Sequence, residues 1–326
     1  MKGQFQPQVF QRDGDPFIYL WVNNQWYCFN PNEQPLGCGA MGTVFLGFSC
    51  NTSQRIAVKM VKSEYANNKT IRERARQEAG LTFSHPNLVQ MIGICEVEQD
   101  KGPIYILSGY VGGITLEKHV KEQLNHLPFA ERVDKIAFEM CNVLDALQYL
   151  HSKGVVHRDV KPSNIMLENG NTIKLMDLGI ARMNGGNNYS SFGFIGTPQY
   201  SAPEQIMRDK DHMELTPRTD VYALGVTFYE LLTGTNPFCS DIEAEVLSRQ
   251  VTKPLPYDKQ IPKKLFKVIR KATEKDPNKR YSTALEFKIA ILDALRDEPQ
   301  NNSPITKIFY AFGIIIFISI IILIFL

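Results

Sequence analysis

Residues His157–Leu167 read His-Arg-Asp-Val-Lys-Pro-Ser-Asn-Ile-Met-Leu, which places a potential base, two cations and an amide within eight residues. Apolar residues flank this polar group on both sides. The proline and the charges disfavour a helix interior, so we expect a loop that presents its side chains. Any one of these residues alone would suggest an ordinary polar surface loop, whereas the complete spaced set indicates a functional one.

A second motif, Asp177-Leu178-Gly179, begins ten residues after Leu167. Together, H-R-D-x-K-x-x-N and D-x-G resemble the catalytic core of the protein kinase family. The resemblance implies that the Asp159 carboxylate orients and deprotonates the attacking hydroxyl, and that Lys161 offsets the transferred charge. It also implies that Asn164 and Asp177 hold Mg²⁺, with Mn²⁺ as an alternative ion, beside ATP.

Composition sets wide bounds on the class of protein. The chain has 326 residues, 44% hydrophobic and 21% charged, which suffices for one bilobal domain or two separate cores. Its net charge of +2 gives no indication of a nucleic-acid partner. The six cysteines show no CxxC pair and no metal-ligand spacing, so we interpret them as reduced thiols of an intracellular domain.

A glycine-rich motif, Gly37-Cys38-Gly39-Ala40-Met41-Gly42, lies between Leu36 and Val44. Dinucleotide-binding folds share this spacing, but there the motif runs into a helix. Here it runs into the β-favouring residues 43–48, which predicts a strand–turn–strand flap over ATP phosphates, as in kinases. The glycines allow the backbone to approach a phosphate without an obstructing Cβ.

Ile56-Ala57-Val58-Lys59 resembles the kinase strand whose lysine holds the α- and β-phosphates of ATP. The charged, helix-favouring stretch 70–83 should carry the glutamate that pairs with Lys59. We expect Glu78, because Gln-Glu-Ala fits the usual local pattern. The spacing to His85-Pro86-Asn87 is about two residues shorter than the family normally shows, so Glu73 remains the alternative.

Two further strands are expected at 88–95 and 103–108, followed by a hinge at Ser108–Gly113. The family often has a glutamate where Gly109 stands, but the hinge binds adenine through backbone groups. The resemblance implies these ATP contacts: Leu36, Gly37, Cys38, Gly39, Ala40, Met41, Gly42, Val44, Ala57, Lys59, Gly109 and Val111.

The N-terminal residues 17–29 hold two aromatic, β-favouring runs around Asn23-Asn24, which predicts a β-hairpin. We expect it to extend the sheet of the small lobe. An edge that binds a partner is the alternative.

In the large lobe, apolar residues at steps of three and four predict a core helix from about Phe129 to Ser152. The resemblance implies that Asp220 holds the backbone of the His157-Arg158 turn. It likewise implies a structural ion pair between Glu204 and Arg280.

The stretch 180–194 has a composition that packs poorly, and we expect it to be mobile. Gly196–Glu204, which ends in Ala-Pro-Glu, resembles the substrate-binding segment of a Ser/Thr kinase. Ser190 and Ser191 are the expected autophosphorylation sites, whereas the Thr197 hydroxyl should bind Asp159 and Lys161. In the family, the arginine at the position of Arg158 binds a phosphate on this segment. Further positive charge is expected from Arg72, Arg74, Arg76 and Arg182.

The last 19 residues, Ile308–Leu326, are almost wholly apolar. A helix of that length spans roughly 28 Å at ~1.5 Å per residue, close to the ~30 Å hydrocarbon core of a bilayer. We therefore expect a single C-terminal transmembrane helix, with the kinase domain on the cytoplasmic side.

These features predict an α+β, bilobal, protein-kinase-like fold. The expected divisions are an extension at 1–32, a kinase domain at 33–297 (small lobe 33–109, large lobe 110–297), a linker at 298–307 and a membrane helix at 308–326. The expected function is a membrane-anchored Ser/Thr kinase that acts on proteins, autophosphorylates and self-associates to do so. It most resembles the eukaryotic-type kinases of bacteria.

Two other functions are alternatives. A pseudokinase scaffold would normally lack one of the four catalytic positions 59, 159, 164 and 177, and none is missing here. A small-molecule phosphotransferase of the aminoglycoside type would lack the Gly-Thr-Pro…Ala-Pro-Glu segment. Lys161 favours Ser/Thr over tyrosine specificity, because tyrosine kinases usually carry Ala-Arg or Arg-Ala in this loop.

Overall fold

A computed structural model describes residues 9–39, 42–66, 72, 76, 83–98, 101–169, 172–177, 189–190, 193–194, 197–211 and 215–296. The chain divides into two compact units. The first comprises residues up to Gly113 together with Met166–Gly196, and the second comprises Ile114–Ile165 and the residues from Thr197 onward. Two units fit the predicted bilobal fold, but Met166–Gly196 groups with the first unit, whereas the sequence analysis assigned 110–297 as a whole to the large lobe.

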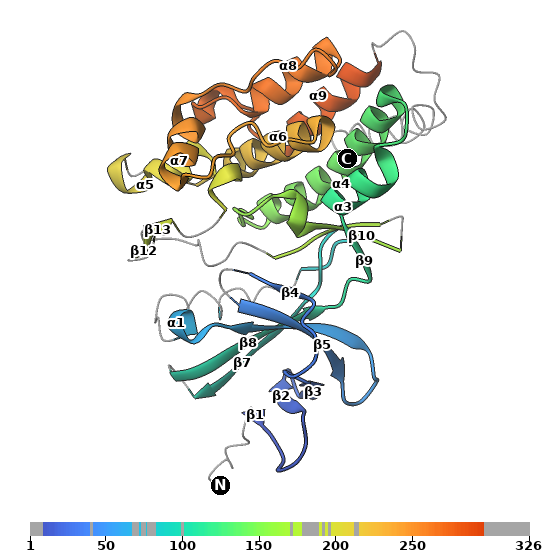
Figure 1. Cartoon of the computed structure of the whole chain (residues 1–326), viewed down its shortest axis with the longest axis vertical. Helices are drawn as coiled ribbons and strands as arrows, with labels where there is room; N and C mark the ends of the chain where they lie inside the picture. Colours follow the sequence, from blue (N-terminus) through green and yellow to red (C-terminus); the bar gives the residue numbers. More distant parts are fainter. Residues whose placement is uncertain are drawn as a thin grey trace, which may run out of the picture. The chain divides into compact units, whose positions relative to one another are not determined.

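The first unit is built on an antiparallel sheet with the strand order β1-β2-β3-β5-β6-β8-β7, with β4 paired to β5 (Figure 1). The two strands expected at 88–95 and 103–108 are present as β7 and β8. The strands of this sheet are β1 (Val9–Phe10), β2 (Ile18–Val22), β3 (Gln25–Phe29), β4 (Gly37–Cys38), β5 (Gly42–Ser49), β6 (Arg55–Val61), β7 (Met91–Glu98) and β8 (Lys101–Gly109).

The N-terminal hairpin forms as predicted. Asn23 and Asn24 adopt φ values of 48° and 61°, the left-handed pair that a two-residue hairpin turn requires and that asparagine tolerates. Trp21 lies opposite Trp26 beside the turn, with ring centroids 5.0 Å apart. β3 continues into the sheet by pairing with β5, so the hairpin extends the small-lobe sheet, and β1 forms the edge.

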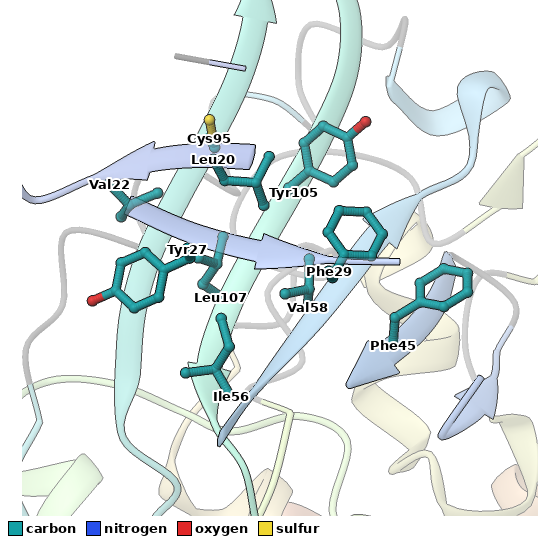
Figure 2. Close-up of a cluster of buried hydrophobic side chains, with 10 residues drawn as sticks. All are labelled: Leu20, Val22, Tyr27, Phe29, Phe45, Ile56, Val58, Cys95, Tyr105 and Leu107. Carbon is teal, nitrogen blue, oxygen red and sulfur yellow. The ribbon is translucent and has the colours of Figure 1, made fainter. Parts of the chain in front are cut away.

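The hairpin also supplies much of the core of this unit. Figure 2 shows ten buried side chains that converge from several strands. Phe29, fully buried, has its ring centroid 5.4 Å from that of Phe45 and 5.6 Å from that of Tyr105. The members of this cluster are Leu20, Val22, Tyr27, Phe29, Phe45, Ile56, Val58, Cys95, Tyr105 and Leu107.

The tip of the hairpin is fitted to an irregularity in β7. Gly93 has φ +155°, and a Cβ there would lie 2.6 Å from Cγ1 of Val22, so a larger residue would displace the hairpin. Asn23 Nδ2 donates to the Ile92 carbonyl at 2.6 Å beside it. Residues outside the kinase-like motifs are therefore part of the folded lobe rather than a loose extension.

The remaining short elements are α1 (Ser63–Ala66), β9 (Gly113–Thr115), β10 (Ile165–Glu168), β11 (Thr172–Leu175), β12 (Tyr189–Ser190) and β13 (Gly193–Phe194). β10 pairs with β11, and β12 pairs with β13. Of the helix expected over 70–83, the structure describes Arg72, Arg76 and Phe83, the first two in helical conformation.

The second unit is helical. α4 spans Phe129–Ser152, as the apolar periodicity predicted, and packs against α6 and α9 (Figure 1). The helices are α3 (Leu116–His119), a π-helical turn (Val120–Leu124), α4, α5 (Pro203–Asp211), α6 (Pro217–Thr233), α7 (Glu243–Thr252), α8 (Lys263–Ala272) and α9 (Ala284–Arg296), with 3₁₀ turns at Pro162–Asn164, Pro198–Tyr200 and Pro277–Lys279.

Local sequence fixes the ends of the central helix α6. Thr216 and Thr219 form a reciprocal capping box at its start, and Pro217 occupies the first turn, where no amide donor is needed. Gly234, with φ 78°, ends it in the left-handed conformation. Within the helix, a Cβ on Gly225 would lie 2.8 Å from Cγ2 of Thr273, so glycine permits close packing there.

None of the helices described here has the length and apolar character needed to cross a membrane. The predicted membrane helix at 308–326 and the linker before it lie outside the described residues.

The contribution of the hairpin to the core can be tested with Leu20→Ala. Leu20 is 0% exposed, so its truncation should lower the free energy of unfolding by about 2–5 kcal/mol in urea denaturation. Ile242→Ala removes a side chain of the same size that is 63% exposed and should cost less than about 0.5 kcal/mol. Equal effects of the two substitutions would show that the hairpin is not integral to the fold.

Candidate active site

The glycine-rich motif forms the predicted strand–turn–strand flap in the first unit. Leu36 N donates to the Val44 carbonyl at 2.8 Å, and Gly39 N donates to the Gly42 carbonyl at 2.9 Å. A Cβ on Gly42 would clash with the Met60 carbonyl, so only glycine fits where β5 begins. Ala40 and Met41 lie outside the described residues.

Lys59, on β6, binds the carboxylate of Asp177. Its Nζ lies 3.4 Å from Asp177 Oδ2, and the two side chains are 27% and 50% exposed. Exposure on both sides makes this a weak ion pair that a charged ligand can readily replace. The predicted partners Glu78 and Glu73 lie outside the described residues, so the choice between them stays a prediction.

The backbone before Asp177 is anchored by the His85-Pro86-Asn87 turn. Leu175 N donates to the Asn87 carbonyl at 2.8 Å, and Val89 N donates to the Leu175 carbonyl at 3.1 Å. The side chain of Asn87 adds a bond to the Ile173 carbonyl at 2.9 Å. Asp177 itself has φ 42°, a left-handed conformation that aspartate adopts more readily than most residues.

At the predicted hinge, one backbone amide is already engaged within the first unit. Gly109 N donates to the Gln90 carbonyl at 2.8 Å, which leaves the Gly109 carbonyl as its group suited to accept from an adenine amine. Ala57 and Val111 are each 7% exposed and add apolar surface, while Leu36 is 47% exposed.

In the second unit, a buried carboxylate organises the catalytic loop. Asp220, 0% exposed, accepts hydrogen bonds from His157 N at 2.8 Å and Arg158 N at 2.7 Å, which are the contacts that the family resemblance implied. His151 Nε2 lies 2.8 Å from the same carboxylate. Burial alone would raise the pKa of Asp220, but the interactions with His151, His157 and Arg158 outweigh it and lower that pKa below its ordinary value.

The loop residues that follow surround one carboxylate. Lys161 Nζ lies 3.1 Å from Asp159 Oδ2, and Asn164 Nδ2 donates to the same oxygen at 2.9 Å and to the Asp159 carbonyl at 2.9 Å. Lys161 also donates to the Thr197 hydroxyl at 2.6 Å, which is one of the two contacts expected of that hydroxyl. Two donors thus orient the Asp159 carboxylate, and an aspartate carboxylate can accept a proton from a hydroxyl.

Each unit offers an oxygen atom of the kind that magnesium takes. Because the Asn164 amide nitrogen donates to Asp159, its carbonyl Oδ1 is the atom suited to a cation. In the first unit, Asp177 offers a carboxylate that is half exposed and weakly paired. Amide and carboxylate oxygens are ligands that magnesium accepts when phosphates supply the rest.

The predicted ion pair between Glu204 and Arg280 is present and buried. Arg280 Nη1 and Nη2 donate to Glu204 Oε1 and Oε2 at 2.7 and 2.9 Å, a bidentate geometry. The Thr219 hydroxyl donates to Glu204 Oε1 at 2.9 Å as well. Each charge is therefore satisfied by several partners, as a buried pair requires.

Two residues around the catalytic loop, Gln205 and His151, escaped the sequence reasoning. Gln205 Nε2 donates to the Arg158 carbonyl at 3.1 Å, and its Oε1 accepts from Ala202 N at 2.9 Å. His151 binds Asp220, as described above. In the sequence, Gln205 stands next to Glu204 of the motif, and His151 is a polar residue near the end of an apolar helix. Neither feature indicates which residue would be the hydrogen-bond partner.

The activation segment is described only in part. Ser190 belongs to β12, where it pairs with Gly193 of β13, and Ser191 lies outside the described residues. The mobility expected for 180–194 concerns mostly residues that are likewise outside them.

The expectation that Arg72 supplies surface charge to this segment was wrong. Its side chain is 0% exposed and donates to Glu96 Oε1 at 2.6 Å and to the Ala66 carbonyl at 2.5 Å. Arg76, 32% exposed, binds the same Glu96 at 2.7 Å. Both guanidinium groups thus hold their helix to β7, while Arg74 and Arg182 lie outside the described residues.

The fold and the arrangement of these motifs define the class. The chain belongs to the protein kinase family: the protein kinase domain matches residues 31–290. Serine/threonine-protein kinase PknB of Mycobacterium tuberculosis is 35% identical over 274 residues, which are 81% of this chain and 42% of that protein. A probable serine/threonine-protein kinase of Streptomyces coelicolor is 33% identical over 274 residues, 81% of this chain and 39% of that protein.

Solved structures agree on the fold. One crystal structure of the Mycobacterium tuberculosis PknI kinase domain is 26% identical with a TM-score of 0.63, over 87% of this chain and 99% of that one. Another structure of the same domain is 25% identical, with a TM-score of 0.61 over 89% of this chain and 100% of that one. The predicted resemblance to eukaryotic-type kinases of bacteria is thus confirmed, although the chain spans about two fifths of the length of the curated relatives it matches.

Asp220→Asn tests the organisation of the catalytic loop. An asparagine keeps one acceptor oxygen but places an NH₂ group against one backbone amide, so unfolding free energy should fall by about 1–3 kcal/mol and turnover by about 10-fold or more. Because the pKa of Asp220 is lowered, its contribution is complete at pH 7 and lost as the pH falls below about 4. The exposed Asp241→Asn is the control. Wild-type turnover in Asp220→Asn would contradict this role.

Proposed function

We propose that this chain is a magnesium-dependent protein kinase that transfers the γ-phosphate of ATP to serine or threonine hydroxyls of proteins. The observation that supports this most strongly is the environment of Asp159. Its carboxylate is held by Lys161 and Asn164, and the same lysine binds the Thr197 hydroxyl of the substrate-binding segment. Membership of the protein kinase family and similarity to named Ser/Thr kinases support the same activity.

The residues divide the reaction between them. Asp159 accepts the hydrogen bond of the substrate hydroxyl and takes its proton as the oxygen attacks the γ-phosphorus. The bond from that phosphorus to the β,γ-bridging oxygen breaks, and ADP leaves. Lys161 supplies positive charge beside the transferred group.

The small-lobe residues bind the nucleotide. The flap amides and Lys59 hold its phosphates, the Gly109 carbonyl accepts from adenine, and Ala57 and Val111 bury the base. Because the Lys59–Asp177 pair is exposed, both side chains would be available when ligands bind: Lys59 would hold phosphate, and Asp177 would be one of the residues that hold the metal. Magnesium, when bound, would neutralise negative charge on the ATP phosphates, and Asn164 and Asp177 would be its protein ligands.

Activation by autophosphorylation at Ser190 or Ser191 is a further part of this proposal. A phosphoserine adds about −1.5 to −2 charge and forms charge-assisted bonds with arginine. Arg158, next to the catalytic aspartate, is the proposed recipient, and self-association would bring two molecules together for transfer between them.

Asp159→Asn should leave ATP affinity within about 2-fold and lower transfer to peptide by at least about 100-fold, because it removes the base and orienter. The full-length enzyme is assayed with ATP, Mg²⁺ and a serine/threonine peptide library, followed by phosphosite mapping, with Asp241→Asn as the matched exposed control. Transfer at the wild-type rate by Asp159→Asn would refute the mechanism. The same maps test autophosphorylation: an active enzyme without phosphate at Ser190 or Ser191 would reject those sites.

We further propose that residues 308–326 anchor the enzyme in a membrane, on the basis of the 19 apolar residues there. Truncation after Arg296 should release the kinase into the aqueous fraction with its activity retained. Full-length protein that alkaline carbonate alone extracts would exclude a spanning helix.

A further inference from the structure

A buried glutamine on α7 binds the backbone of the substrate-binding segment. Gln250, 0% exposed, donates from Nε2 to the Pro198 carbonyl at 3.2 Å and to the Gln199 carbonyl. These carbonyls belong to the 3₁₀ turn Pro198–Tyr200, directly after Thr197. One side chain thus reaches two backbone acceptors of this turn, and Asn236 Nδ2 reaches the Gln199 carbonyl as well, at 3.4 Å.

Two further residues orient that amide. The Tyr222 hydroxyl, on α6, donates to Gln250 Oε1 at 2.5 Å and accepts from Lys275 Nζ at 2.7 Å. A protonated lysine has three donors and no acceptor, so the hydroxyl proton must point at Gln250. The amide oxygen is thereby fixed toward Tyr222, and the amide nitrogen toward Pro198 and Gln199.

The lysine sits in an apolar and cationic environment. Its Nζ lies 4.2 Å from the ring centroid of Phe238 and 5.0 Å from that of Tyr222. Burial, followed by the charge of Arg280, lowers the pKa of Lys275 to about 7, and Glu274 opposes this shift. The charged groups facing it are therefore Arg280, itself paired with Glu204, and Glu274.

We propose that Gln250 is a positioning residue for protein substrate: through Tyr222 and Lys275 it fixes the turn Pro198–Tyr200 against which the substrate lies. The proposal rests on the proposed kinase function and deepens it. Pro198 and Gln199 directly follow Thr197, whose hydroxyl binds Lys161. A shift of their carbonyls would therefore move the substrate hydroxyl that receives the phosphate away from Asp159. None of these contacts involves a residue assigned to ATP binding. Loss of the contacts should therefore change the KM for peptide and leave the KM for ATP nearly unchanged.

The kinetic experiment uses full-length enzyme and the variants Tyr222→Phe, Gln250→Met and their combination, with the exposed Gln260→Met as control. Loss of these hydrogen bonds should raise KM for a peptide substrate about 5- to 15-fold and change KM for ATP less than about 2-fold. Because the residues act in series, the double variant should be no worse than Gln250→Met alone. The proposal would be overturned if the KM values for peptide and ATP rose together, or if the effects of the two substitutions multiplied in the double variant. Either result would indicate that these residues act only through core packing.

The pH dependence gives a readout that packing alone would not change. Below about pH 7, charged Lys275 enforces the orientation of the hydroxyl; above it, the neutral amine can accept from Tyr222 and the orientation is lost. The KM for peptide should therefore rise between about pH 6 and 8 in the wild type and stay flat in Lys275→Met. The same rise in Lys275→Met would contradict the role of the lysine.

Hydrogen–deuterium exchange separates this proposal from the proposed function. Tyr200 N and Ser201 N donate within the turn, to the Thr197 and Pro198 carbonyls. Tyr222→Phe, which keeps the ring, should speed exchange of these amides several-fold without altering that of α4. Unchanged exchange would overturn the positioning role. If exchange is faster but the protein phosphorylates no peptide, the hold of Tyr222 and Gln250 on the turn is supported and only the proposed kinase activity is refuted.

Discussion

The carboxylate of Asp220 is the constraint on which the large lobe depends. Arg158 has φ 71°, a left-handed conformation that costs a non-glycine residue roughly 1–2 kcal/mol. The amides of His157 and Arg158 donate to Asp220 and offset that cost, while Gln205 donates to the Arg158 carbonyl. Asp159 is the next residue in the chain. The direction of its side chain is therefore set by Arg158, a strained residue that is held at both its amide and its carbonyl.

The first two turns of α6 extend this control to three separate segments. Asp220 holds the catalytic loop, Thr219 donates to Glu204 at the end of the substrate-binding segment, and Tyr222 donates to Gln250. The helix is fixed in turn by its capping box and by the close packing that Gly225 allows. Residues far apart in the sequence thus share one rigid reference, and this suits chemistry that needs a hydroxyl and a carboxylate aligned.

Much of this was predictable because local patterns carry it. The apolar period gave the bounds of α4, Asn23-Asn24 gave the hairpin, and the β-favouring residues after Gly42 distinguished a flap from a dinucleotide-binding turn. The roles of Asp220, Glu204 and Arg280 came from family spacing, and the contacts agree with them. What failed were polar contacts between distant segments. The expectation that Arg72 supplies charge to the activation segment fails because its side chain is 0% exposed and binds Glu96 and two backbone carbonyls. Gln205, Gln250 and His151 have no periodic signal, since each is defined by a partner that only the fold brings near.

The central claim is that Asp220 acts on catalysis through the loop that carries Asp159, and a double-mutant cycle tests it most directly. The turnover of Asp220→Asn, Asp159→Asn and the double variant would be measured with one peptide at saturating ATP. If Asp220 works by aligning Asp159, the double variant should be about as slow as Asp159→Asn alone, because no base remains to be misaligned. Effects that multiply, with the double variant slower by the product of both losses, would show that Asp220 contributes independently of that loop and would contradict the account.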